Sequence, residues 1–335
     1  MRRAALALAL GTASLAGAPA GPVGGAPAAW WRADRPVARW TGALPAVAAA
    51  VRWQAVRPGV EVAELALAAT PGDGGGLAVR GAGQTAWAAV RAGAVPVRVV
   101  LVRLDPGALR FRLAVAERPD GTVGPWRIDA APGAAAVALN AGQFTDDGPW
   151  GWLVHRGRER QAPGAGALAG AFVVDTAGRA RVVGADSVTV LSAAARAGDR
   201  AVAMAVQSYP TLLDGDGRVP DALRPGGPGG VDLAHRDARL AVAELRDGRL
   251  LVALTRFDAP VGGGGGTALG AAAGRVPVGL TVPEAAALVG ALGARRAVLL
   301  DGGLSAQLLV RGAAGAARRW PGLRAVPLGI AAAPR

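Results

Sequence analysis

Beyond Val51 the chain is divided into short apolar runs separated by Gly, Pro and Asp. Runs of four to eight residues between turn residues are typical of β-strands and too short for most helices. Asp247-Gly248 separates two of the runs and predicts a hairpin between them. The nine predicted strands are Val97–Arg103, Phe111–Ala116, Ala136–Leu139, Ala171–Asp175, Ala201–Gln207, Ala238–Leu245, Arg249–Thr255, Ala297–Leu300 and Ala306–Val310.

One helix is well marked at its beginning and its end. Thr281-Val282-Pro283-Glu284 has the pattern of a capping box, with Thr as N-cap, Pro in the first turn and Glu at N3. An apolar stretch to Leu292 follows, and Gly293 is a suitable C-terminal stop. We therefore expect an α+β fold with an extended mixed or antiparallel sheet, few helices and a single main domain.

The N-terminal residues predict export. Arg2 and Arg3 precede a short apolar segment and small-residue cleavage sites, which is the pattern of a signal peptide over residues 1–20. Residues 21–50, rich in Pro, Ala and Gly, are expected to be a flexible leader, and residues 51–330 the folded domain. The chain has no cysteine, so neither a lipid anchor nor disulfides are expected. We predict a periplasmic or extracellular protein without a stable membrane span after cleavage.

The net charge of +13 would ordinarily suggest a nucleic-acid or membrane partner. The arginines are dispersed, however, with no run longer than two, and the chain has no lysine. Replacement of Lys by Arg under GC-rich codon drift explains this better than a nucleic-acid site. We expect no nucleic-acid partner, but a surface that attracts anionic substrates.

Asn140 is the only asparagine in the chain and Tyr209 the only tyrosine. AT-rich codons persist in a GC-rich gene mainly where the side chain cannot be replaced, so these residues are the first candidates for function. A structural turn at Asn140 is the alternative interpretation.

Four segments place polar residues and glycines at predicted strand ends. The candidates that they carry are Asn140 and Gly142, then Gln207 and Tyr209, then His235, Arg236, Asp237 and Arg239, and finally Asp301, Gly302, Gly303 and Ser305. Together they supply amides, carboxylates, guanidinium groups and glycine loops, which suit a phosphorylated sugar. Each segment alone could be structural. No cofactor is expected; a divalent cation at Asp214-Gly215-Asp216-Gly217 is the alternative, but a turn fits that sequence better.

These segments, in this order, resemble the phosphodiester glycosidase family between about Val51 and Gly329. The matching motifs are Asn140–Phe144, Gln207 with Pro210 and Leu212, Arg239 with Asp247-Gly248, and Leu300–Ser305. Three positions that are usually glycine in the family are Ala141, Tyr209 and Leu304 here. Bacterial members are exported and often linked to exopolysaccharide.

The resemblance implies a hydrolase that cleaves the glycosidic bond of a sugar-1-phosphodiester. It suggests that Arg239 contacts the phosphate, helped by Arg236 or His235, and that Asp301 is the principal carboxylate. Asn140 would orient sugar hydroxyls, Gly302 and Gly303 would offer backbone N–H groups, and Asp237 or Asp147 would be the second carboxylate.

Two other functions fit the same residues. One is a non-catalytic exported module that binds anionic polysaccharide through arginine and exposed tryptophan. The other is a phosphodiesterase that cleaves the other side of the phosphate. The expected partner of the hydrolase is a small-molecule or polysaccharide sugar phosphodiester as substrate.

Overall fold

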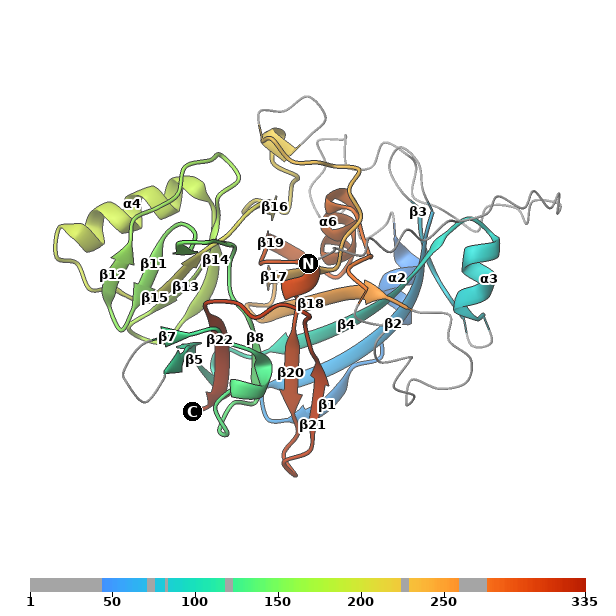
Figure 1. Ribbon diagram of the computed structural model, residues 1–335, viewed down its shortest axis with the longest axis horizontal. Coiled ribbons are helices and arrows are strands. Elements are labelled where there is room, and N and C mark those ends of the chain that lie inside the picture. Colours follow the sequence, from blue (N-terminus) through green and yellow to red (C-terminus); the bar gives the residue numbers. More distant parts are fainter. Residues whose placement is uncertain (1–43, 71–75, 82–83, 118–122, 224–228, 259–275) are drawn as a thin grey trace, which may run out of the picture.

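The structure, a computed structural model, describes residues 44–70, 76–81, 84–117, 123–223, 229–258 and 276–335. An eight-stranded antiparallel sheet runs through the middle of the molecule in the order β1-β2-β4-β18-β17-β19-β16, with β3 paired to β2 (Figure 1). Its strands are β1 (Gln54–Arg57), β2 (Val60–Thr70), β3 (Gly76–Val79), β4 (Val95–Leu104), β16 (Thr211–Leu213), β17 (Arg239–Leu245), β18 (Leu250–Phe257) and β19 (Ala294–Leu299).

Two five-stranded antiparallel sheets lie on one side of this central sheet. The first has the order β21-β20-β8-β22-β5, and the second β12-β11-β15-β13-β14. Their strands are β5 (Leu109–Ala114), β8 (Val137–Asn140), β11 (Leu153–His155), β12 (Arg158–Gln161), β13 (Ala171–Asp175), β14 (Ala180–Val183), β15 (Val202–Gln207), β20 (Leu308–Arg311), β21 (Ala317–Trp320) and β22 (Gly329–Pro334). Short ribbons pair β6 (Ala116–Glu117) with β7 (Val123–Gly124) and β9 (Phe144–Thr145) with β10 (Gly148–Pro149); the 3-10 turns are η1 (Ile128–Ala130), η2 (Asp221–Leu223) and η3 (Gly303–Ser305).

Both faces of the central sheet are buried, which explains why its strands read as nearly continuous apolar runs. In β4, Val99 and Leu101 point into one core, and Val100 and Val102 into the other. Side chains alternate between the faces of a strand, so each strand serves two cores. Helices α2 (Pro45–Ala50) and α6 (Val282–Ala291) contribute buried side chains to the first core.

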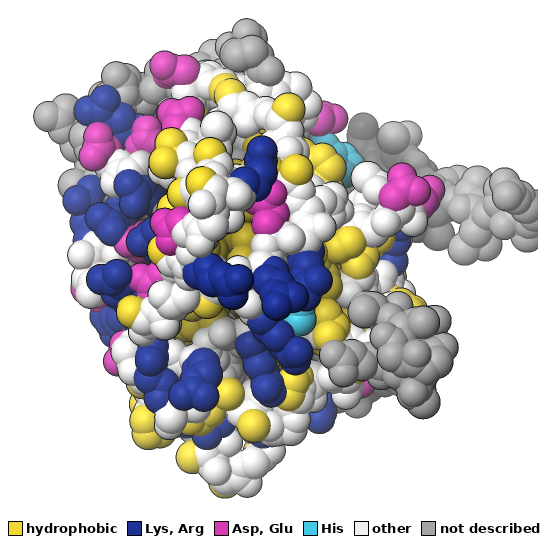
Figure 2. Space-filling model, turned by 90° about the vertical axis from the view of Figure 1, so that its left-hand side faces the viewer, with side chains coloured by type: hydrophobic (Ala, Val, Ile, Leu, Met, Phe, Trp, Pro, Cys, Tyr) yellow, Lys and Arg dark blue, Asp and Glu magenta, His cyan; other side chains and the backbone are white. Residues whose placement is uncertain are grey.

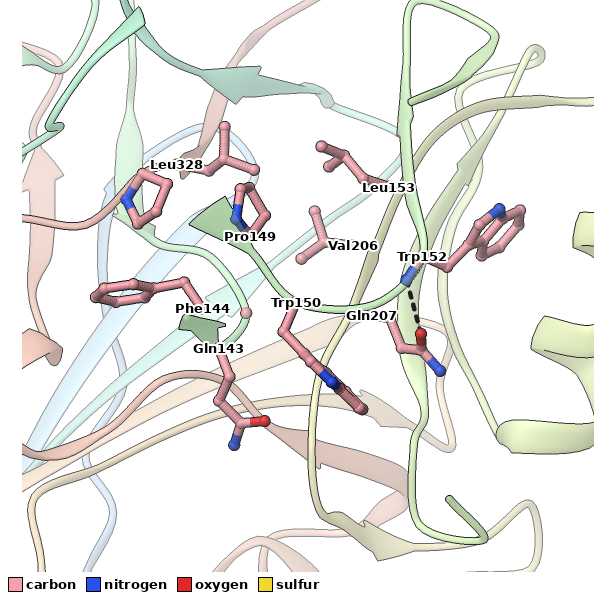
Figure 3. Close-up of a pocket in the computed structure, with 11 residues that line it drawn as sticks. Gln143, Phe144, Pro149, Trp150, Trp152, Leu153, Val206, Gln207 and Leu328 are labelled. Carbon is pink, nitrogen blue, oxygen red and sulfur yellow. Dashed lines mark hydrogen bonds between the residues drawn. The ribbon is translucent and has the colours of Figure 1, made fainter. Parts of the chain in front are cut away.

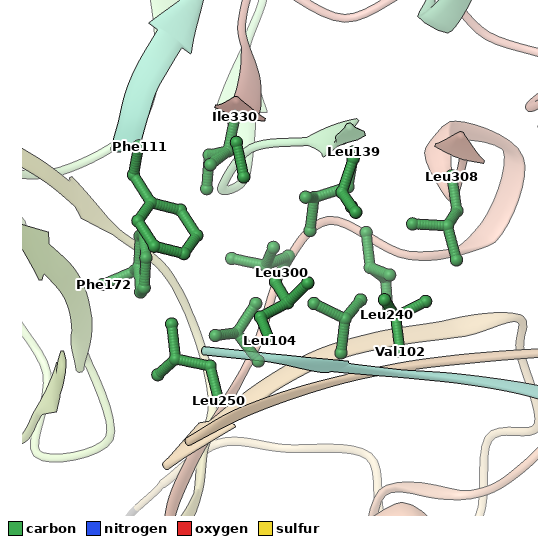
Figure 4. Packing of buried hydrophobic residues seen from close by; sticks show 14 of the residues in the cluster. Val102, Leu104, Phe111, Leu139, Phe172, Leu240, Leu250, Leu300, Leu308 and Ile330 are labelled. Atoms are coloured by element: carbon green, nitrogen blue, oxygen red, sulfur yellow. The ribbon is translucent and has the colours of Figure 1, made fainter. Parts of the chain in front are cut away.

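The second core joins the central sheet to both five-stranded sheets. Figure 4 shows Leu139, Leu308 and Ile330 facing Leu240 and Val102 of the central sheet. Phe111 and Phe172, from the two different five-stranded sheets, meet edge to face with their ring centres 5.6 Å apart. One continuous core therefore unites all three sheets into the expected single main domain of the α+β class.

Helix α6 follows its sequence signals closely. The Thr281 side chain accepts from the Glu284 N–H at 3.3 Å, and the Glu284 carboxylate accepts from the Thr281 N–H at 2.9 Å. All ten residues of α6 are buried, because the helix packs against the first face of the central sheet. The capping box and the Asp247-Gly248 hairpin between β17 and β18 are both confirmed.

All nine predicted strands are present, with shifts at their ends. In the part of the chain that the structure describes, three helices were not predicted: α2, α3 (Ala86–Arg91) and α4 (Ala185–Arg196), of which α4 buries Val188 against the outer side of the sheet that contains β13 and β15. None of the helices in the described ranges is long and apolar enough to cross a membrane.

The predicted leader ends earlier than residue 50. Leu44 and Val47 are buried in the first core, so α2 belongs to the folded domain. The predicted signal peptide over residues 1–20 lies outside the described residues.

We expect Thr281→Ala to destabilise the protein by about 1 kcal/mol, because the N-cap hydrogen bond to Glu284 is lost. Thr281→Ser keeps the hydroxyl and should stay close to the wild type. Chemical unfolding of the three proteins measures the difference; equal stability of the Ala and Ser variants would contradict the capping role.

Candidate functional site

The four predicted segments meet where several strands of the central sheet begin or end. β17, β19 and β16 are antiparallel neighbours, so the start of β17, the end of β19 and the start of β16 lie side by side. This arrangement brings Arg239, Asp301 and Tyr209 to adjacent strand ends. β8 joins them from the second layer, since the Asp301 N–H donates to the Ala141 carbonyl at 3.2 Å.

Two glycines let the loop after Asp301 lie directly on β17. A Cβ on Gly302 would stand 2.6 Å from the Ala238 carbonyl oxygen. Gly303 has φ +57°, and its Cβ would stand 2.9 Å from a carboxylate oxygen of Asp237. The Gly303 N–H donates to the Ala238 carbonyl at 2.8 Å, so it holds the loop and is not free for a ligand.

Asn140 acts from behind this loop. Its Nδ2 donates to the Asp301 carbonyl at 2.7 Å and to the Ala141 carbonyl at 3.3 Å, and its Oδ1 accepts from the Gln307 N–H at 2.9 Å. The side chain is fully buried. The predicted contact with sugar hydroxyls is therefore replaced by a positioning role, because both amide hydrogens already have protein partners.

Gln207 is likewise a structural clamp and not a ligand contact. Its Oε1 accepts from the N–H groups of Trp152 and Gly164 at 2.7 and 2.8 Å. Its Nε2 donates to the carbonyls of Gly164 and Ala169, both at 3.1 Å. This buried amide makes four hydrogen bonds, which is its full capacity.

Gly142 allows close packing beside Gln207. A Cβ at Gly142 would lie 2.2 Å from the Gln207 carbonyl oxygen. Close packing against Gln207 therefore explains why the first motif has a glycine at position 142. The predicted approach of a ligand to this backbone is not required to explain it.

Arg236 is committed to the N-terminus of α6. Its two Nη atoms donate to both carboxylate oxygens of Glu284 at 2.7 and 2.6 Å, and Glu284 is 1% exposed. This bidentate pair neutralises the Arg236 guanidinium. The phosphate contact predicted for Arg236 is therefore expected from other residues.

Arg239 is oriented without being neutralised by its hydrogen bonds. Nε donates to the Leu280 carbonyl at 3.0 Å, and one Nη donates to the His235 carbonyl at 2.7 Å. Burial lowers the pKa of Arg239, while the charge of Asp237 opposes this shift. The guanidinium nevertheless stays charged at all physiological pH values.

Asp301 and Asp237 are the two carboxylates of the site. Burial raises the pKa of Asp301, and the charge of Asp237 raises it further; a hydrogen bond from Ser305 and the charge of Arg324 act in the opposite direction. Burial also raises the pKa of Asp237, against the charge of Arg239. Two partly buried carboxylates beside cationic groups are a common arrangement for acid–base chemistry.

The remaining candidates lie around these carboxylates. The exposed His235 places Nε2 3.8 Å from Oδ2 of Asp237. Tyr209 donates its hydroxyl to the Gly229 carbonyl, and burial raises its pKa. Asp147 is exposed in the turn between β9 and β10, so Asp237 is the better second carboxylate.

Arg324 was missed by the sequence interpretation. Its guanidinium carbon lies 4.5 Å from the ring centre of Phe144, and its backbone N–H donates to the Leu304 carbonyl at 2.9 Å. It comes from the loop between β21 and β22, which carries no motif. Only the fold places this charge near Asp301.

A small hollow lies beside Phe144, between the β9–β10 ribbon and β15 (Figure 3). Pro149, Trp150, Leu153 and Val206 line it. It holds about 10 Å³, which is room for one water and not for a sugar.

No group of three potential His, Asp or Glu metal ligands occurs within the described part of the chain. At Asp214-Gly215-Asp216-Gly217, the Asp214 carboxylate accepts from the N–H groups of Asp216 and Arg218, both at 3.0 Å. That segment forms a turn after β16.

Residues 133–332 match the family model for phosphodiester glycosidase. The chain belongs to the phosphodiester glycosidase family. The match covers more than half of the chain and includes all four motif segments. Family membership assigns the protein, in coarse terms, to the hydrolases that act on sugar phosphodiesters. Among curated proteins, none matches the chain.

The solved structures that the chain resembles agree with this fold. The catalytic domain of zebrafish N-acetylglucosamine-1-phosphodiester alpha-N-acetylglucosaminidase, auto-inhibited by its pro-peptide, has a TM-score of 0.58 at 15% identity, over 85% of this chain and 88% of that one. A Burkholderia pseudomallei protein described as exported has a TM-score of 0.50 at 16% identity, over 85% and 96%. A Synechocystis protein has a TM-score of 0.50 at 15% identity, over 85% and 64%. At such identities the likeness establishes the fold alone.

We expect Gln207→Leu to destabilise this phosphodiester glycosidase family member by about 3 kcal/mol, because the buried backbone groups of Trp152 and Ala169 and two partly buried ones of Gly164 lose their partners. Gln161→Leu on the edge strand β12 is the control and should change stability by less than about 0.5 kcal/mol. Urea unfolding measures both; equal effects would refute the clamp.

The raised pKa of Asp301 predicts how the stability of the protein depends on pH. A raised native pKa adds stability below the ordinary Asp value of 3.8, and this contribution is lost as the pH rises through the native value. Asp301→Asn removes a partly buried charge, so we expect the variant to melt above the wild type at pH 7. The gap should close on acidification below about 4.

Thermal unfolding across this pH range, with the exposed Asp147→Asn as control, measures the effect. A variant less stable than the wild type at pH 7 would show that the Asp301 carboxylate is not destabilising when charged.

Proposed function

We propose that the protein is an exported hydrolase that cleaves the bond between C1 of a sugar and the phosphodiester oxygen, on envelope or exopolysaccharide material. The observation that carries this proposal is that a partly buried carboxylate, Asp301, and an oriented cationic guanidinium, Arg239, lie at adjacent strand ends. The family match supports the reaction class.

Arg239 is proposed to bind the phosphate. Its bonds to the Leu280 and His235 carbonyls fix the plane of the guanidinium and leave its charge for an anion. A planar fork in a partly buried place suits a phosphodiester and strengthens the interaction. Arg324, over the Phe144 ring, is proposed as a second cation that stabilises the leaving phosphomonoester.

Asp301 is proposed to serve the sugar side of the bond. The C1–O bond breaks, its electron pair leaves with the phosphate, and C1 gains oxocarbenium character that the carboxylate stabilises. A water then attacks C1 and gives its proton to Asp301, whose raised pKa makes it a better base than an exposed aspartate. Asp237, close to Asp301, is proposed to accept a hydrogen bond from the sugar or the water.

The products are the free sugar and a phosphomonoester of the remaining partner. Because phosphate is a good leaving group, the reaction depends less on a general acid than ordinary glycoside hydrolysis does. The predicted signal sequence supports export to the periplasm or the cell exterior.

A para-nitrophenyl diester of a sugar-1-phosphate tests the bond that is cleaved. The glycosidase releases sugar and para-nitrophenyl phosphate, so colour appears only after a phosphatase is added. A phosphodiesterase releases coloured para-nitrophenol directly, and a pure binding module releases nothing. Either of the last two outcomes overturns the proposal.

Asp301→Asn and Arg239→Ala should each lower kcat/KM by about 10²–10³-fold, because each removes a charge that acts on the transition state. Asp147→Asn, in the exposed turn, is the matched control and should keep its rate. Wild-type rates for both Asp301→Asn and Arg239→Ala would exclude the proposed roles.

A further inference from the structure

A second, larger groove lies between the edge strand β5 and the strands β11 and β15. Its floor is apolar and includes Phe111, Leu113 and Met204, and basic side chains stand along it, namely Arg112, His155 and Arg156. None of its lining residues is acidic. The groove holds about 390 Å³, which is within the range of ligand-binding sites.

Figure 2 looks at the side of the molecule where β11 and β12 lie. It shows dark blue side chains, all arginine because the chain has no lysine, gathered around a histidine with apolar side chains beside them. Like charges this close repel one another, so the cluster favours an anion that neutralises it.

The turn between β11 and β12 fixes the backbone of Arg156 beside the groove. Arg156 and Gly157 are the two residues of this turn, with φ +54° and +71°. A hairpin turn of two residues commonly requires positive φ at both of them. Arg156 is the one residue other than glycine with positive φ within the described ranges.

The groove lies next to the small hollow beside Phe144. Leu153 and Val206 line the small hollow beside Phe144, whereas His155 and Met204 line the groove. The pairs Leu153–Val206 and His155–Met204 are two residues apart on one antiparallel ladder, so they share a face about 7 Å apart. The hollow borders Phe144, over which Arg324 lies.

We propose that this groove binds an anionic polysaccharide chain, the polymer that carries the sugar phosphodiester to the site. The inference rests on the proposed function for the link to catalysis. Guanidinium forks suit the carboxylate or phosphate groups of such a polymer. A nucleic acid fits less well, because Phe111 is buried and provides no exposed platform for stacking.

Binding to polymers tests the groove separately from catalysis. The variant is Arg112→Ala with Arg156→Ala, and the control is Arg52→Ala with Arg91→Ala, two exposed arginines beside α2 and at the end of α3. Titration calorimetry at low salt uses polygalacturonate, phosphomannan, neutral dextran and duplex DNA as probes. The two anionic polysaccharides separate carboxylate from phosphate recognition.

We expect the groove variant to bind at least one anionic polysaccharide roughly tenfold more weakly, with the control within about twofold of the wild type. Dextran should not bind, and hydrolysis of the small para-nitrophenyl diester should be unchanged. Equal binding by the variant and the wild type overturns the inference, as does an equal loss of binding to duplex DNA. Failure of the wild type to hydrolyse the small diester would instead refute the proposed function.

Discussion

The hydrogen bonds of Asn140 are the interaction on which the candidate site depends. One side chain joins the end of β8 to the Asp301 carbonyl and to the Gln307 N–H, which are on either side of the η3 turn. The loop between β19 and β20 is thereby fixed at both of its ends. Because β8 belongs to the second layer and β19 to the central sheet, this single amide also ties the two layers together where the carboxylate emerges.

That constraint explains how a carboxylate can be held in a partly buried place. Burial makes the charged form of Asp301 unfavourable, and a free loop would turn the side chain towards solvent. The bond from the Gly303 N–H to Ala238 and the bonds from Asn140 remove this freedom. The fold supplies the stability, and the site retains a carboxylate whose proton affinity is raised.

Nine strands could be predicted because they are short apolar runs with turn residues between, whereas others, among them the eleven-residue β2 and the polar β12, were missed. The capping box of α6 was equally readable, since Thr281 and Glu284 interact locally. Helix α4 was missed because its alanines give little apolar periodicity and only Val188 and Ser192 are buried. The division into three sheets could not be read either, because it depends on pairings between distant strands such as β8 with β20 and β22.

For the site, the motifs located the right segments but did not separate contact from support. The candidate residues at strand ends do meet, as expected. Arg236 and Arg239 are only three positions apart, yet the first is paired with Glu284 and the second bonds to carbonyls. No spacing rule distinguishes them, since the difference arises from α6 packing beside β17. Arg324 has no local signal either, because only the fold brings the loop between β21 and β22 close to Asp301.

The rare polar residues of this chain have a common physical role. An amide donates and accepts at the same time, which neither arginine, a donor only, nor alanine can do. Asn140 and Gln207 use that property to join backbone groups from separate segments. In a gene that drifts towards Ala, Gly and Arg, such a buried cross-link has no substitute. Retention against drift therefore marks the residues that hold the site in place, while the groups proposed to do chemistry, Asp301 and Arg239, are of types that the drift permits.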